Sequence, residues 1–339
     1  MYLTLKNIKM FNFFKSPDVE FENPPCITGS LKAHLTSDDW YTQMIDYNKV
    51  QTLTEGFSGR IAVLDDTALH SNRYLDGVIE MVYEFTEEKG SSGYHGHHVS
   101  GIIASKKHGL FKNNKIGLFK VLSSVNGKGI GRWISAGIDA ALAEKYEVIN
   151  ASMGSGINDP KISASVKNFV SNNKRFFVTA SGNSARATDY PAALSAIMPG
   201  VISVGAVDYV NNKYQIAAFS SFGAVTLVTA GVDILSTFPD HKEEYLSGTS
   251  MATPFIAGLI ASAKAIYPPF THDDFHAVAV KCAQKIDNTS VTHQGYGVVD
   301  MADFLTEVHK LSKNPIESPK KVLTPKTKWY QKVLSFLEI

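Results

Sequence analysis

The chain has 339 residues, of which 44% are hydrophobic and 19% are charged, enough to bury one large core with short extensions. Its net charge of +1 gives no reason to expect a nucleic acid or an anionic membrane as a partner. The two cysteines, Cys26 and Cys282, are too few for a disulfide framework, and we interpret both as free thiols.

Residues 1–37 form an N-terminal extension that precedes the first predicted domain. Its apolar stretch Phe11-Asn12-Phe13-Phe14 is too short and too interrupted to be the core of a signal peptide. We therefore expect a cytoplasmic protein, and secretion only by a route that needs no such signal. We expect no transmembrane span and find no internal repeat.

Apolar runs alternate with helical patterns along residues 38–312, where we expect a single catalytic domain. The runs stop abruptly at charged or turn residues, as buried strands do. The predicted strands are residues 61–65, 116–121, 148–152, 176–180 and 201–207, and the predicted helices are residues 133–145, 162–172 and 273–284. This alternation predicts an α/β fold of three layers, with a mostly parallel central sheet flanked by helices.

Ser250 follows a Gly-Thr turn at the point where an apolar helical stretch begins. Pro254 is expected in the first turn of that helix, where its missing N–H costs little. The free N–H groups of a helix start stabilise a developing negative charge, so Ser250 is well placed to be a nucleophile. Taken alone, the same segment is equally typical of an ordinary helix cap.

A hydroxyl nucleophile needs a histidine to take its proton and a carboxylate to orient that histidine. Asp65 ends a predicted strand, at the sheet edge where open α/β proteins place their sites. His95 opens a helix of small residues further along the chain. His95, His97 and His98 could instead indicate a metal site, but the sequence shows no matching cluster of carboxylates or cysteines.

These three segments, in the chain order Asp, His, Ser, resemble the motifs of the subtilisin-like serine proteases, or subtilases. The aspartate strand of the family falls on residues 61–65. Its His-Gly-Thr-His-Val-Ala-Gly motif is similar to residues 95–101, with His97 in place of the threonine, and Gly-Thr-Ser-Met-Ala-Thr-Pro stands unchanged at residues 248–254. The resemblance runs from about Trp40 to Leu311.

The resemblance implies a serine endopeptidase that forms an acyl-enzyme through Asp65, His95 and Ser250, with Asn183 in the oxyanion hole. It also implies that a protein or peptide substrate lies between two stretches and bonds to their main chains. These stretches are Ser152-Met153-Gly154 and Gly127-Lys128-Gly129.

Two other functions compete with this one. An inactive subtilase that binds peptides or serves in assembly is the alternative. A non-proteolytic α/β hydrolase is disfavoured because Met251-Ala252 follows Ser250, where that class has x-Gly.

Two acidic residues are expected to contact a basic substrate side chain. Asp66 follows Asp65 as the second acid does in kexin-like members, and Asp189 is expected near the floor of the S1 pocket, beside a Tyr190-Pro191 bond that can be cis. Asp189 could instead pair only with Arg186, and Met153 suits an apolar substrate side chain equally well.

Many subtilases carry a calcium loop in the helix after the catalytic histidine. In this chain residues 102–115 run quickly to the next strand and contain four lysines, which repel a cation that needs several oxygen ligands. We therefore expect no calcium in this loop, no metal ligands among the site residues and no required cofactor; calcium at other sites stays open.

The two ends lie outside the resemblance. Intracellular members of the family have a short N-terminal extension that can block the cleft, and we hypothesise that Phe21-Glu22-Asn23-Pro24-Pro25 lies across the active site, because prolines resist cleavage and favour an extended backbone. The alternative is a surface arm. Residues 313–339 are expected to form a polar linker and a short amphipathic helix from Trp329. Either extension could mediate self-association.

Overall fold

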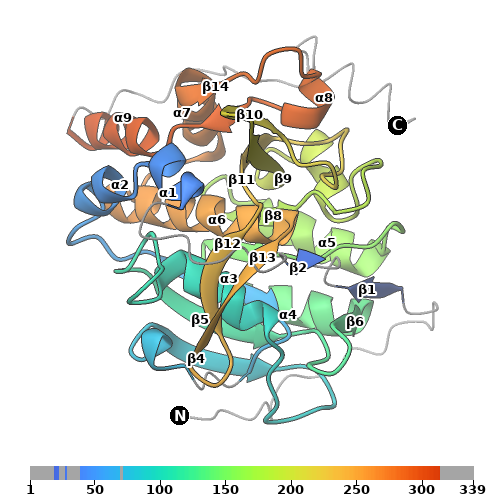
Figure 1. The fold of residues 1–339 in the computed structure, drawn as a ribbon. Helices are drawn as coiled ribbons and strands as arrows, with labels where there is room; N and C mark the ends of the chain where they lie inside the picture. The colour runs from blue at the N-terminus through green and yellow to red at the C-terminus, as the bar shows by residue number, and fades with distance from the viewer. Residues whose placement is uncertain (1–18, 23–26, 29–38, 69–71, 314–339) are drawn as a thin grey trace.

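A large, mostly parallel sheet forms the centre of the protein, as the computed structural model in Figure 1 shows; it describes residues 19–22, 27–28, 39–68 and 72–313. The strand order is β14-β15-β11-β9-β8-β7-β3-β5-β4, and β10 pairs with β9. The strands are β3 (Arg60–Asp65), β4 (Ile79–Glu84), β5 (Lys115–Lys120), β7 (Val148–Ala151), β8 (Phe176–Ala180), β9 (Val201–Val210), β10 (Lys213–Ile216), β11 (Leu227–Ala230), β14 (Ala283–Gln284) and β15 (Val298–Val299). Only the β9–β10 and β14–β15 pairs are antiparallel within this described sheet.

Helices cover both faces of this sheet (Figure 1). One face carries α3 and α6, and the other carries α4 and α5, which also pack on each other. The described helices are α1 (Trp40–Ile45), α2 (Tyr47–Leu53), α3 (His95–Ala104), α4 (Gly131–Ala143), α5 (Pro160–Val170), α6 (Thr249–Ile266), α7 (His272–Cys282), α8 (Val291–Gln294) and α9 (Met301–Lys313).

Side chains of the central strands alternate between these two layers. Along β3, Ile61 and Val63 join the core under α3 and α6, whereas Ala62 and Leu64 join the core under α4 and α5. A strand buried on both faces needs apolar residues at every position, which is why the predicted strands read as unbroken apolar runs. The prediction of a three-layer α/β fold is confirmed.

Short strands outside the central sheet tie the N-terminus to the domain. β1 (Glu20–Glu22) pairs with β6 (Lys128–Ile130), and β2 (Ile27–Thr28) pairs with β13 (Lys242–Ser247), which forms a hairpin with β12 (Ile234–Phe238). We call the described residues 19–22 and 27–28 the N-terminal arm.

The predicted helix over residues 273–284 is two residues too long. α7 ends at Cys282, and Ala283 and Gln284 form β14, which pairs antiparallel with β15. The helical prediction was wrong there because pairing at the sheet edge uses the backbone groups of these two residues, and a local pattern does not show such a distant partner.

α6 is the one described helix that is long and apolar enough to cross a membrane by length and composition. Almost all of it is buried inside the protein, as is typical of the core helix of a globular domain. The predicted C-terminal linker beyond Lys313 and the predicted helix from Trp329 lie outside the described residues.

Candidate active site

The site residues lie where neighbouring parallel strands end. Asp65 is the last residue of β3, residues 152–154 follow β7, and Asn183 follows β8, and these strands are adjacent in the sheet. Parallel strands bring their carboxyl ends to one edge, so residues far apart in the sequence meet there. α3 and α6, which carry His95 and Ser250 at their starts, pack against each other on one face.

Asp65 holds His95 through both of its carboxylate oxygens. The Nδ1 atom of His95 lies 2.9 Å from Oδ1 and 2.9 Å from Oδ2 of Asp65, and both residues are only 1% exposed. Oδ1 also accepts the N–H of Asp66 at 2.8 Å, which fixes the carboxylate. With an acceptor at Nδ1, the proton of a neutral His95 belongs on Nδ1, and Nε2 is left as the basic nitrogen.

Asp66 does not line the substrate-binding stretches as the sequence predicted; its carboxylate binds the start of α3. Its side chain is buried and its Oδ1 accepts the N–H of Gly96 at 2.9 Å, in the first turn of α3. Burial and the neighbouring Asp65 carboxylate raise the pKa of Asp66 above its ordinary value. Asp66 therefore secures the helix that carries His95, since a carboxylate at a helix start binds the free N–H groups there.

Ser250 is the second residue of α6 and is fully buried. Its Oγ donates to the carbonyl of Ser152 at 3.3 Å, and Ser152 Oγ donates back to the Ser250 carbonyl at 3.2 Å. That carbonyl has no helical donor, because Pro254, four residues on, lacks an N–H. Pro254 lies in the second turn of α6, not in the first as the sequence predicted, because α6 begins at Thr249. The hydroxyl of Ser152 supplies the hydrogen bond that the missing N–H of Pro254 cannot donate.

Two N–H donors point to one place beside Ser250. Asn183 Oδ1 accepts the N–H of Thr249 at 2.9 Å and its Oγ1–H at 2.8 Å, which fixes the amide so that Nδ2 faces the other way. No described residue accepts from this buried Nδ2. A Cβ on Gly248 would lie 3.0 Å from Nδ2 and 3.7 Å from the Ser250 nitrogen, so Gly248 leaves the space between the two donors open.

The N-terminal arm lies between the two stretches expected to bind substrate. Glu22 and Gly154 exchange two backbone hydrogen bonds of 3.2 Å, while on the other side Phe21 pairs with Gly129 and Glu22 with Lys128. Gly127 forms the turn before β6, with a φ of +69°. Further on, residues 27 and 28 pair with β13, whose last residue lies three positions before Ser250.

The arm therefore contacts the predicted substrate-binding stretches with residues 21 and 22, and the strand that leads to Ser250 with residues 27 and 28. The residues between, 23–26, lie outside the described residues, so the hypothesis that residues 21–25 cross the site is supported at its first two positions only. Phe21 is 1% exposed and belongs to the core cluster that also contains Met153. Met153 is thus a core residue in the structure.

Asp189 lines a pocket of about 250 Å³ together with Gly154 and Ser184. Its Oδ1 lies 3.7 Å from Arg186 Nη2, an ion pair between a buried carboxylate and a largely exposed guanidinium. The Tyr190–Pro191 peptide bond is cis, as the sequence suggested.

His97 and His98, the two other histidines of the His95 motif, serve the structure around His95. His98 is buried and its Nε2 lies 2.9 Å from the carbonyl of Glu244, while burial lowers the pKa of His98 to about 3. His97 Nδ1 lies 3.0 Å from the carbonyl of Gly93. Within the described part of the chain no three His, Cys, Asp or Glu side chains are grouped to hold a metal, and Cys282 is a buried free thiol.

Sequence reasoning missed two supporting residues. Thr249 orients the Asn183 amide through both its N–H and its hydroxyl. Lys120 ends β5, level with Asp65, and its buried ammonium donates to Ser91 Oγ at 2.7 Å and to the Glu88 carbonyl at 2.7 Å, which secures the loop before His95. The sequence pattern that could have indicated Lys120 is a lysine at the end of an otherwise apolar strand.

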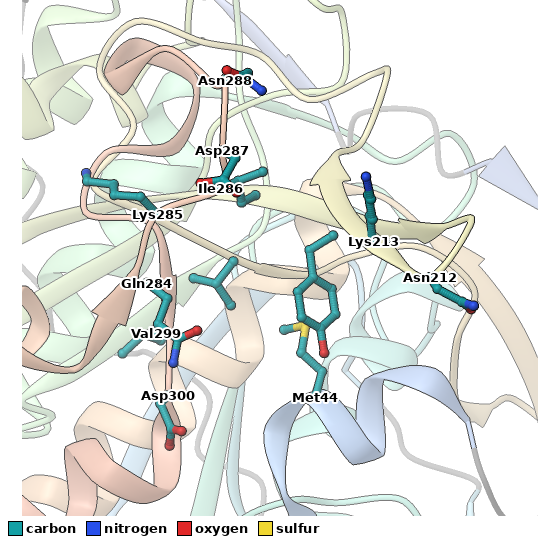
Figure 2. A pocket seen from close by; sticks show the side chains of 12 residues that line it. Met44, Asn212, Lys213, Gln284, Lys285, Ile286, Asp287, Asn288, Val299 and Asp300 are labelled. Atoms are coloured by element: carbon teal, nitrogen blue, oxygen red, sulfur yellow. The ribbon is translucent and has the colours of Figure 1, made fainter.

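A larger pocket, of about 550 Å³, lies by the β14–β15 edge of the sheet (Figure 2). Its lining includes Met44 of α1, Lys213 of β10 and Asp287 in the segment after β14. Some of its polar groups already bond to nearby backbone: Asp300 Oδ1 accepts the N–H of Asp303, and Lys285 donates to the carbonyl of Gly295. These contacts shape the edge of the fold.

Comparison with known proteins gives one consistent family. The profile of the subtilase family matches residues 58–297. The chain is 33% identical over 265 residues to the thermophilic serine proteinase of Bacillus sp. (strain AK1), which covers 73% of this chain but only 63% of that protein, under two thirds of its length. It is 33% identical over 229 residues to the major intracellular serine protease of Bacillus subtilis (strain 168), and this match covers 62% of this chain and 69% of that protein. It is 31% identical over 293 residues to the intracellular serine protease of Paenibacillus polymyxa, and this match covers 80% of this chain and 86% of that protein.

Proposed function

The chain belongs to the subtilase family, and from this premise we propose that it is a serine endopeptidase acting on protein or peptide substrates. The observation that carries the proposal is the space at Gly248. The Nδ2 atom of Asn183, which has no described partner, and the N–H of Ser250 both border that space. An unpartnered buried donor costs free energy unless a ligand uses it, and an oxyanion is the ligand that fits two N–H donors.

In the proposed reaction Ser250 Oγ attacks the scissile carbonyl while His95 Nε2 takes its proton. Asp65 keeps the Nδ1 proton in place and stabilises the imidazolium that forms. Asn183 Nδ2 and the Ser250 N–H donate to the oxyanion of the tetrahedral intermediate. His95 then protonates the leaving amine, which frees the acyl-enzyme, and a water molecule activated by the same nitrogen hydrolyses it.

The substrate is proposed to bind as the arm does, as an extended strand between β6 and residues 152–154. Such a peptide gains its affinity from main-chain hydrogen bonds on both sides, which need no particular sequence. The pairing of Glu22 with Gly154 supplies the direction of the chain, antiparallel to both stretches.

We further propose that the arm keeps the cleft closed in the newly made protein. The arm uses the backbone groups that a substrate would need, and Phe21 anchors it with a fully buried side chain. Asn23-Pro24-Pro25-Cys26 connects the two paired parts. A peptide bond that precedes a proline resists cleavage, because the proline ring restrains the backbone at the leaving nitrogen. Activation then requires the arm to leave or to be cut elsewhere, by a second molecule of the enzyme.

Two relatives are named intracellular proteases, and we propose a cytoplasmic location for this chain as well.

The test of the proposed activity is a comparison of the purified protein with its Ser250→Ala variant. Both are incubated with an unfolded protein, and the masses of all fragments are mapped. We expect cleavage of the added protein and removal of N-terminal residues only in the unmodified chain. Equal fragment patterns from both proteins would rule the proposal out.

A further inference from the structure

The pocket beside Gly154 carries an inference about which peptides are cut, and it rests on the proposed function. Gly154, Ser155 and Gly156 line one wall, Ser184, directly after Asn183, belongs to another, and Glu20 and Glu22 of the N-terminal arm line the pocket as well. In the binding mode proposed above, the substrate replaces the arm, and a substrate residue whose carbonyl reaches Asn183 Nδ2 has this pocket beside its side chain. The pocket then serves as the S1 subsite, which receives the side chain on the acyl side of the cut bond.

Asp189 contributes a carboxylate to the lining of this pocket. Its backbone is fixed, since its N–H donates to the Ser181 carbonyl at 3.1 Å and its carbonyl accepts from Ala193 at 2.9 Å. A Cβ at Gly182 would come within 2.6 Å of Asp189 Oδ2, and a Cβ at Gly154 within 2.9 Å of Asp189 Cβ. The side chain thus lies between the substrate-binding stretch and the turn that carries Asn183.

This carboxylate lacks full compensation. Asp189 is 8% exposed, and its Oδ1 has no hydrogen-bond partner among the described residues. Burial raises the pKa of Asp189, and the charge of Arg186 lowers it. A buried charged group without a close partner costs free energy, so a cationic side chain that enters the pocket is stabilised by pairing with this carboxylate.

Arg186 partly fills this role when the pocket holds no cation. Its Nη2 is 3.7 Å from Asp189 Oδ1, beyond hydrogen-bond distance, and its side chain is 63% exposed. A Cβ at Gly156, on the opposite wall, would lie 3.5 Å from the same guanidinium nitrogen. Arg186 therefore reaches across the mouth of the pocket and is held there weakly.

We propose that Asp189 makes this enzyme cut after lysine and arginine, and that Arg186 is an internal competitor that the basic side chain of the substrate displaces. An apolar side chain in the same pocket would leave the buried carboxylate oxygen without a partner. Sites that are built to pair with a polar group discriminate strongly against ligands that lack it. Asp66 takes no part, because its carboxylate is committed to the start of α3.

The experiment is a competition assay with the full-length protein. Four peptides that differ only in the residue before the cut, Arg, Lys, Leu or Phe, are mixed in one reaction. Competition makes the ratio of kcat/KM values independent of the fraction of molecules whose arm has left the cleft. We expect the basic peptides to be cut at least about 100-fold more efficiently than the apolar ones.

Two variants separate the roles of the charges. Asp189→Ser is expected to lower kcat/KM for the basic peptides by about 100-fold or more and to leave the apolar peptides unchanged or improved. Arg186→Ala is expected to raise kcat/KM for the basic peptides by up to about fivefold, the limit set by a weak exposed ion pair. Asp287→Asn, in the larger pocket at the β14–β15 edge, is the matched control and is expected to match the unmodified protein.

Labelling of Ser250 by a fluorophosphonate, measured on the same samples, distinguishes the two proposals. Labelled protein that prefers Leu or Phe, or Asp189→Ser protein that is labelled and keeps its preference for basic peptides, overturns the assignment of Asp189 and leaves the proposed function intact. The same measurements on Phe21→Ala protein, whose arm has lost its buried anchor, test the function itself. If that protein neither labels nor cuts any peptide, the proposed function is overturned, and the specificity with it.

Discussion

Two pockets in the described part of this protein differ both in volume and in how their polar groups are paired. The pocket at the β14–β15 edge has about 550 Å³ and the pocket beside Gly154 about 250 Å³. In the larger one, Asp300 and Lys285 bond to backbone of the same region. In the smaller one, Asp189 Oδ1 has an ion pair with Arg186 but no hydrogen-bond partner among the described residues, and Asn183, whose Nδ2 also has none, precedes the lining residue Ser184.

Polar groups that are buried and unpaired cost free energy, and two of them beside one pocket, next to a buried Ser250, favour a binding role for that pocket. The comparison therefore assigns binding and chemistry to the smaller pocket and a structural role to the larger one. Variants placed in one region with a matched control in the other can break this assignment.

The largest effect is expected for Ser250→Ala, which removes the nucleophile. We expect kcat to fall by about 10⁶, the size of the loss known for the catalytic serine of a subtilisin. Initial rates on an unfolded protein substrate measure the effect, and Asp287→Asn in the larger pocket is the control. Comparable losses in both variants would erase the distinction between the two regions.

The next effect is expected for Asn183→Ala, which removes one donor to the oxyanion. We expect kcat to fall by about 10²–10³ with little change in KM, again the size known for the corresponding asparagine in a subtilisin. Thr249→Val is the graded control, because it removes one of the two bonds that orient the amide and should cost less. A loss confined to KM would show that Asn183 only binds substrate.

The arm offers a pair of matched changes with a gain in activity. Phe21→Ala removes a fully buried side chain, which should weaken the docking of the arm by up to about 3–5 kcal/mol. The cleft should then be open more often, and the initial rate on a short peptide should rise by about 100-fold. Glu20→Gln removes only an exposed ion pair with Lys128 and should change the rate less than fivefold. Unchanged rates in both variants, or in protein that lacks residues 1–37, would show that the arm does not inhibit.

A smaller effect is expected on stability, away from the cleft. His276 Nε2 lies 2.8 Å from the Pro199 carbonyl and Nδ1 lies 2.9 Å from the Tyr296 hydroxyl, and burial lowers the pKa of His276 to about 4. In the unfolded chain its pKa is about 6.5, so between these values only the unfolded state binds the proton. The contribution of His276 to the free energy of unfolding should therefore fall by about 1.4 kcal/mol per pH unit as the pH drops from 6.5 towards 4.

Denaturant unfolding in the inactive Ser250→Ala background measures this pH dependence without self-digestion. His276→Gln should lower the slope of the unfolding free energy against pH by the contribution of this one histidine. It should leave peptide cleavage in the active protein unchanged. A variant with the full slope of the parent would show that His276 does not carry the effect.

The smallest effect is expected on removal of divalent metal. α3 ends at Ala104, and the segment that leads to β5 carries lysines where ligands for calcium would be needed. We propose that EDTA leaves the Tm unchanged, as measured by thermal unfolding in the Ser250→Ala background. A large fall in Tm that added calcium restores would contradict this.

The sequence predicted the fold and the pair Asp65 and His95 well, because buried parallel strands are continuous apolar runs and the motifs are local in sequence. It could not predict the side-chain direction of Asp66, which depends on how the turn after β3 meets Gly96. It also could not predict β14, whose partner β15 lies further along the chain. The position of the arm stays a hypothesis on the sequence alone, because the pairing of Glu22 with Gly154 joins residues more than a hundred positions apart, and residues 23–25 lie outside the described residues.

Reaction with a fluorophosphonate tests the central claim most directly, because the reagent labels only a serine that a neighbouring base activates and an oxyanion hole supports. Mass spectrometry of the labelled protein identifies the modified residue. We predict a single modification on Ser250 that is abolished by His95→Ala and that forms faster in Phe21→Ala. Labelling at another residue, or none in the Phe21→Ala protein, would contradict the account.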